Sequence, residues 1–197
     1  RAPFGMKLTP DGKKALILHH NGVLTVVDTD NLDNAVRIPS YDNQRPVVLD
    51  GTTFLGIAFS KDSKIAYLSG GDKGNVVIFD IEKLVKTGEI SLNTPDFEES
   101  FTSDHTRNEL LVLDRAHFRL VRIDLNTRKI TTSIKTGRIP FGITLSPDRE
   151  WAFVANVGLY EYPAVPGVTK TNKDTMMLRF PPYATPSKEA EEGVTLP

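Results

Sequence analysis

Hydrophobic positions along this chain fall in short runs that are bounded by Gly, Pro, Asp or Asn, and helical periodicity is weak. β-Branched and aromatic residues dominate these runs, which is typical of strands. Between residues 54 and 92 the pattern predicts four strands, at 56–60, 65–69, 76–80 and 88–92. A nearly continuous apolar run at 151–155 predicts a strand that is covered on both faces.

One segment recurs four times, with starts near residues 3, 54, 97 and 140. The copy at 140–156 reads PFGITLSPDREWAFVAN, and the copy at 3–19 reads PFGMKLTPDGKKALILH. The anchor aspartates Asp11, Asp62, Asp104 and Asp148 are separated by 51, 42 and 44 residues. Repeats of this length built from short strands indicate a β-propeller. We therefore predict an all-β fold of four-stranded antiparallel blades, with about 3.5 blades present.

Each repeat carries an aspartate in a tight turn between its first two predicted strands, as in Thr-Pro-Asp-Gly at 9–12 and Ser-Pro-Asp-Arg at 146–149. Proline presets the turn backbone, and the aspartate side chain accepts hydrogen bonds from the residues that follow. A second series, Asp28, Asp80 and Asp124, ends the third strand of three repeats. Because both series repeat, we interpret them as turn caps rather than as metal ligands or catalytic groups.

Residues 120–156 run through an apolar strand ending in Asp124, a Thr-rich turn, a Gly-x-x-Pro-x-Gly segment, Ser-Pro-Asp and the strand end Phe-Val-Ala-Asn at 153–156. This order resembles the YVTN repeat of the YncE-like β-propeller family, and the resemblance covers about residues 1–158. The third copy departs from it, since Phe-Glu-Glu-Ser at 97–100 replaces the Pro-x-Gly segment. The resemblance implies a bacterial propeller, periplasmic or extracellular, and says little about chemistry.

The repeat pattern ends at residue 158, and residues 159–197 are rich in proline and aromatic side chains. We expect an insertion with little regular structure, either a connector or a covering segment anchored by Tyr160, Tyr162, Phe180 and Tyr183. Residues 156–162 and 186–191 also resemble the insertion of propellers that are joined to an alkaline-phosphatase-like phosphoesterase domain. No phosphoesterase metal motif occurs in the chain.

Composition narrows the function classes for this 197-residue chain. The net charge of −1, with both signs interspersed, predicts no nucleic-acid partner. The absence of cysteine excludes disulfides and Cys-based zinc sites, and fits a periplasmic or cell-surface, secreted protein. No apolar run is long enough to predict a membrane span. Since a ring needs more blades, we expect missing sequence or another chain to supply them.

Propeller connectivity gathers the loops between blades and the loops between second and third strands on one face. That face carries the candidate ligand-binding residues Arg1, Arg138, His19, Asp72, Asp114 and His117. A longer connection at 40–52 adds Tyr41, Asp42, Arg45 and Asp50. Arginines there suit an anionic ligand, and they suit carboxylates of neighbouring blades equally well.

No nucleophile with its base, phosphate-binding glycine loop or other catalytic signature appears in the sequence. We therefore expect a non-catalytic binding or scaffold propeller that presents its loop rim to a partner protein, a peptide or a small anionic ligand. We expect no cofactor, no metal site and no catalytic residue. The alternative is the propeller portion of a larger phosphoesterase, or a lactonase-like hydrolase, which rests on fold analogy alone.

Overall fold

The computed structural model describes residues 3–19, 22–42, 44, 46–49, 56–70, 74–92, 98–104, 107–115, 117–157, 177–178 and 194–195. At 98–103, 177–178 and 194–195 only the backbone is described. The chain divides into two units, Arg1–Val157 and Gly158–Pro197. Over the described ranges every regular element is a strand, and none is a helix that could cross a membrane.

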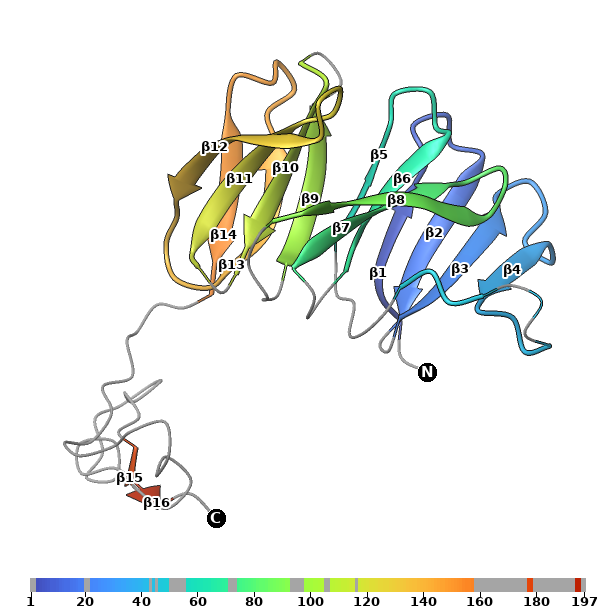
Figure 1. Ribbon diagram of the computed structural model, residues 1–197, viewed down its shortest axis with the longest axis horizontal. Helices are drawn as coiled ribbons and strands as arrows, with labels where there is room; N and C mark the ends of the chain where they lie inside the picture. Colours follow the sequence, from blue (N-terminus) through green and yellow to red (C-terminus); the bar gives the residue numbers. More distant parts are fainter. Residues whose placement is uncertain are drawn as a thin grey trace. The chain divides into compact units, whose positions relative to one another are not determined.

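Three four-stranded antiparallel sheets follow one another in the first unit, each with its strands in sequence order (Figure 1). The first sheet contains β1 Pro3–Leu8, β2 Lys14–His19, β3 Val23–Asp28 and β4 Ala35–Ile38. The second contains β5 Ile57–Phe59, β6 Ile65–Ser69, β7 Asn75–Asp80 and β8 Val85–Ser91. The third contains β9 Glu98–Asp104, β10 Glu109–Asp114, β11 Arg119–Asp124 and β12 Lys129–Lys135.

A fourth sheet pairs β13 Pro140–Leu145 with β14 Ala152–Asn156. We call the four sheets blades 1 to 4, and Figure 1 shows them side by side in chain order. Their first strands contact each other from blade to blade, through β1 with β5, β5 with β9 and β9 with β13. The predicted all-β partial propeller, with about three and a half blades, is therefore confirmed.

Apolar side chains of neighbouring blades form the core, one cluster for each contact between blades. Equivalent positions on the second strand show the pattern, because Leu16 packs in the cluster between blades 1 and 2, and Tyr67 in the cluster between blades 2 and 3. Leu111 packs in turn against blade 4. Side chains alternate between the two faces of a strand, so each blade contributes to two clusters. This explains why the middle positions of the second strands are apolar. The prediction that the 151–155 strand is covered on both faces is wrong for the described residues, where Trp151 and Phe153 are largely exposed because no further blade packs against them.

The turns between first and second strands are closed by the aspartates that the repeat predicts. Asp62 Oδ1 accepts hydrogen bonds from Ser60 Oγ (2.6 Å) and from the N–H of Lys64 (3.2 Å). Asp11 and Asp148 make the same pair of contacts in blades 1 and 4. Asp80 and Asp124 likewise accept N–H groups of the turns that follow them. The prediction of turn caps is confirmed for Asp11, Asp62 and Asp148 of the first series and for Asp28, Asp80 and Asp124 of the second.

Asp104 corrects the alignment of the third repeat. It pairs with Glu109 at the end of the β9–β10 hairpin, where blade 2 has Ser60 hydrogen-bonded to Ile65. Asp104 therefore occupies the position of the serine or threonine, two residues before the expected anchor aspartate. The third repeat also differs in its turn. Its left-handed residue, Asn108 (φ 53°), lies four residues after Asp104, whereas Gly12, Ser63 and Arg149 lie three residues after the hydroxyl of their turns.

In the second unit the structure describes one small antiparallel pair, β15 Met177–Leu178 with β16 Val194–Thr195. The proposed anchors Tyr160, Tyr162, Phe180 and Tyr183 lie outside the described residues. The covering role of residues 159–197 stays a prediction.

Candidate functional site

The ends of the second strands define one edge of the propeller, which we call the loop rim. Strand pairing places His19, Asp114 and Asn156 at equivalent positions, each at the end of its strand and opposite the start of the first strand. Gly70 follows β6 at the same position of blade 2. Four different side-chain chemistries thus occupy one repeated position on this rim.

Asp114 is the centre of the most highly connected part of the loop rim. The residue is only 1% exposed. Its carboxylate accepts hydrogen bonds from the Arg119 side chain and from the backbone and the ring of His117. Arg119 Nε lies 2.7 Å from Oδ2, while His117 donates its backbone N–H to Oδ1 over 3.1 Å. The His117 ring nitrogen Nδ1 lies 3.0 Å from both carboxylate oxygens. These contacts fix the orientation of the exposed imidazole.

Arg138 joins this cluster from the connection between blades 3 and 4. Its guanidinium lies over the ring of Phe118, 5.2 Å from the centroid, which is within the range of cation–π attraction. Phe118 is held with φ 52°, and its carbonyl accepts the N–H of Thr136 (2.8 Å). The loop between β10 and β11 and the connection carrying Arg138 are therefore in direct contact.

The structure brings together three of the six sequence-predicted site residues: Asp114, His117 and Arg138. His19 occupies the equivalent rim position of blade 1, where its Nε2 lies 3.0 Å from Thr25 Oγ1. Arg1 and Asp72 lie outside the described residues, as do Arg45 and Asp50 of the 40–52 connection. Sequence reasoning missed Phe118 and Arg119, although both directly follow His117 in the loop it had selected.

A shallow pocket of about 280 Å³ lies beside His19 on blade 1. Its other walls are Val23, Thr25, Arg37 and Tyr41. The Arg37 guanidinium lies 4.2 Å from the centroid of the Tyr41 ring and donates to the carbonyl of Pro39. The pocket is lined by the guanidinium of Arg37 and by the rings of His19 and Tyr41. Among the described residues, no side chain from another blade lines it.

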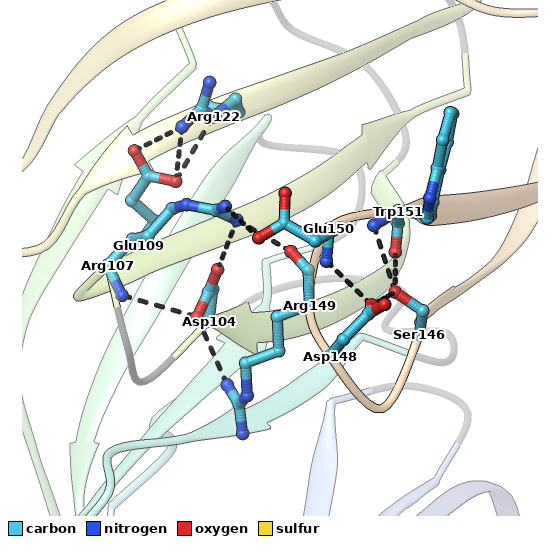
Figure 2. Close-up of polar contacts among 9 residues, drawn as sticks. All are labelled: Asp104, Arg107, Glu109, Arg122, Ser146, Asp148, Arg149, Glu150 and Trp151. Atoms are coloured by element: carbon cyan, nitrogen blue, oxygen red, sulfur yellow. Dashed lines mark hydrogen bonds and ion pairs between the residues drawn. The ribbon is translucent and has the colours of Figure 1, made fainter.

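The opposite edge, which we call the turn rim, carries the turns between first and second strands. Here Figure 2 shows an ionic cluster that joins blades 3 and 4 around the nearly buried carboxylate of Asp104. Arg107 Nη1 lies 3.0 Å from Asp104 Oδ2, and Arg149 Nη1 lies 3.2 Å from Oδ1. Arg107 also donates to the carbonyl of Arg149 over 2.8 Å. The cluster fixes the two neighbouring turns to each other.

Chemically, the loop-rim cluster offers cationic and imidazole donors around one buried carboxylate. Asp114 accepts donors from His117 and Arg119 and so holds both side chains in place. In the part of the chain that the structure describes, no three His, Cys, Asp or Glu side chains gather in a group that could hold a metal ion. The arrangement suits the binding of an anion.

No family model and no curated protein sequence matches the chain. Solved structures with a similar fold include hydrazine synthase of Kuenenia stuttgartiensis and U3-55K. The first aligns with a TM-score of 0.64 at 20% identity, over 79% of this chain and 43% of that chain. The second aligns with a TM-score of 0.57 at 10% identity, over 68% and 39%. The chain thus spans less than half the length of either, and the likeness concerns the fold alone.

Proposed function

We propose that this protein is a binding propeller whose loop rim holds a small anion or an anionic group of a peptide or protein partner. The observation that carries the proposal is the cluster in which Arg138 meets the loop anchored by Asp114. Arg119 pairs with the single carboxylate of Asp114, and Arg138 adds a second guanidinium over the neighbouring Phe118 ring, so an additional anion is electrostatically favoured.

Preorganisation supports the same proposal. The Asp114 carboxylate ties the His117 ring and the Arg119 head to the rim before any ligand arrives. Phe118 gives the Arg138 guanidinium a planar surface to rest on. Side chains that are already ordered lose less conformational entropy on binding, which favours affinity at a small site.

The wider assignment is part of this proposal. The YVTN-like repeat pattern favours a bacterial, periplasmic or cell-surface member of the YncE-like propellers. Further blades, from the same chain or another, would complete the ring. Met6 and Leu8 of β1 are exposed, although Ile57 and Phe59 at the same positions of β5 are buried. Exposed apolar faces of this kind are typical of interaction sites, which favours a neighbouring blade against β1. No observation on the described residues favours the phosphoesterase or lactonase-like alternative.

The test is isothermal titration calorimetry of the protein with inorganic phosphate and, separately, with citrate. We expect Arg138→Ala to weaken binding about five-fold, the loss of roughly 1 kcal/mol for one partly exposed charged hydrogen bond. Lys13→Ala, which removes an exposed cation from the turn rim, is the matched control and should leave affinity unchanged. Equal losses in both variants, or none in Arg138→Ala, would remove the loop rim as the binding site.

A further inference from the structure

The fourth blade presents an open strand edge within the described residues. Blades 1 to 3 each place a third and fourth strand beside the second, whereas β14 pairs only with β13. Ser146 donates its N–H to the carbonyl of Trp151 over 2.9 Å, so antiparallel alternation directs the backbone of Ala152 and Val154 away from β13. These backbone groups form a row that can pair with another strand.

The surface beside this edge is apolar where the equivalent surface of blade 2 is covered. Leu120 pairs with Ile134 in blade 3 as Val76 pairs with Ile90 in blade 2. Ile90 is 3% exposed because blade 3 packs against it, whereas Ile134 is 46% exposed. Leu120 is buried like Val76, but the fourth-strand position that is core at Ile90 is surface at Ile134.

A groove of about 350 Å³ occupies this place between blade 3 and β14. Leu120, Arg122 and Ile134 line it on blade 3, and Trp151 and Ala152 line it on the side of β14. The ionic cluster of the turn rim closes one end, through Asp104, Arg107, Arg149 and Glu150. Arg122 is neutralised by a bidentate ion pair with Glu109, with Nη2 at 2.7 Å from both carboxylate oxygens (Figure 2). The groove therefore presents apolar side chains beside acidic and basic residues that are paired with one another, with little net charge.

We infer that this groove binds an antiparallel β-hairpin, which adds to the edge of β14 as the third and fourth strands of blade 4. Main-chain hydrogen bonds to Ala152 and Val154 would supply affinity, and side chains that face Leu120 and Ile134 would supply specificity. The groove continues the apolar contact that Leu111 and Leu113 already make with blade 4. A small polar ligand would leave the strand edge and the apolar side chains of the groove unsatisfied.

The interior blades specify the chemistry of the hairpin. The third strand of blade 2 packs Val77 and Phe79 against blade 1, and that of blade 3 packs Val121 and Ile123 against blade 2. The occupant should thus alternate, with β-branched or aromatic residues at every second position of its first strand. This inference develops the proposal that further blades complete the ring, and it does not depend on an anion at the loop rim.

The experiment uses the single tryptophan of the chain as a reporter. Trp151 is 68% exposed and lines the groove, so an added strand would shield it. The probe is a synthetic peptide with the sequence of residues 119–135, the chain's own third and fourth strands of blade 3. Its saturable binding should shift Trp151 emission to the blue and reduce acrylamide quenching at least two-fold. A peptide with Val121→Lys and Ile123→Lys should have no effect.

Two protein variants locate the binding. Ala152→Pro removes an N–H from the open edge while leaving the pairing with β13 in place, and should abolish the shift. Ile134→Lys should weaken the affinity for the peptide ten-fold. Ser133→Lys, on the other face of the same exposed strand, should leave this affinity unchanged. Peptide binding that survives Ala152→Pro, or no shift at all, would overturn the inference. Protection of Trp151 that grows with protein concentration alone would mean that a second copy covers the groove, and would overturn it too. Phosphate binding through Arg138 is measured separately, so its loss leaves this test intact.

Discussion

The two rims of the propeller use the same repeat in opposite ways. On the turn rim, blades 1, 2 and 4 place a hydroxyl at one position and an aspartate two residues later, and all three turns carry the same hydrogen bonds. On the loop rim, the equivalent position is His19 in blade 1, Gly70 in blade 2, Asp114 in blade 3 and Asn156 in blade 4.

The difference separates structural chemistry from candidate function. A tight turn between two strands poses the same backbone problem in every blade, so the same solution recurs. On the loop rim the shared backbone demand falls on the residue before the third strand, which is left-handed at Gly22, Gly74 and Phe118. The position at the end of the second strand carries a different residue in each blade. Residues that differ between equivalent positions are therefore the first candidates for binding. Asp104, which replaces the hydroxyl in blade 3, is the exception on the turn rim.

The largest loss of stability should come from removing the Asp104 carboxylate. Asp104→Ala leaves Arg107 and Arg149 without the carboxylate that joins blades 3 and 4. Both arginines are partly exposed, so water can solvate them in the variant. We therefore expect the free energy of unfolding to fall by about 2 kcal/mol, less than for a fully buried ion pair. Urea unfolding of the variant measures this loss.

Asp104→Ser is the matched control, because it restores the hydroxyl that Ser60 and Ser146 supply in the other turns. It should recover part of the stability by closing the turn. If Asp104→Ser were as unstable as Asp104→Ala, the turn rim would not be built on interchangeable hydroxyl and carboxylate groups, and the comparison between the rims would weaken.

Two glycines, one on each rim, should respond to alanine for different reasons. At Gly70, on the loop rim, a Cβ atom would lie 1.6 Å from Asn75 Oδ1 and 2.7 Å from the Asn75 carbonyl oxygen. At Gly12, on the turn rim, a Cβ atom would meet open space, but the backbone has φ 73°. We expect Gly70→Ala to lower the stability of the folded protein by about 2 kcal/mol, because the added methyl group overpacks the site. Gly12→Ala should lower it by about 1 kcal/mol, because alanine is strained in the left-handed region.

Thermal unfolding of both variants, with Gly12→Asn as a control, distinguishes the two causes. Asparagine tolerates the left-handed region, so Gly12→Asn should lose less stability than Gly12→Ala. A reversed order at position 12, or a Gly70→Ala variant as stable as the parent protein, would contradict this account of the two rims.

The sequence predicted the turn rim more fully than the loop rim, for physical reasons. Turn chemistry is local, so Ser-x-Asp motifs identify the hairpins and even the strand bounds at 65–69. Side-chain packing across loops is not local. Phe118 occupies the left-handed position that glycine holds in blades 1 and 2, at Gly22 and Gly74, and its ring lies under the Arg138 guanidinium.

The alignment of Asp104 failed for a related reason. Its identity matched the anchor aspartates, but its strand register, opposite Glu109, assigns it to the position of Ser60. One shift of two residues changed a solvent-facing turn cap into a buried link between blades. Connectivity decides which loops share a face, and Arg138 contacts Phe118, the residue after His117. That these residues form a ligand site stays a prediction.

The smallest effect should appear on the turn rim at low pH. The hydroxyl of Ser60 and the N–H of Lys64 hold the pKa of Asp62 below its usual value, and the equivalent contacts lower the pKa of Asp11 and Asp148. A lowered pKa means that the folded state prefers the ionised carboxylate. Stability from these turns is therefore complete above the usual carboxyl pKa of about 4, and is lost as the pH falls through the folded-state pKa.

Ser60→Ala tests the cause directly, because the Ser60 hydroxyl is the largest contributor to the lowered pKa of Asp62. Carboxyl carbon chemical shifts followed by NMR between pH 2 and 6 should show the pKa of Asp62 rising toward its usual value, while that of Asp148 stays where it was. The variant should also lose less stability than the parent protein on acidification, since less of its turn energy depends on ionisation. An unchanged Asp62 titration would show that the Lys64 N–H alone closes the turn. The recurring hydroxyl at Thr9, Ser60 and Ser146 would then need another explanation than the capping of aspartate.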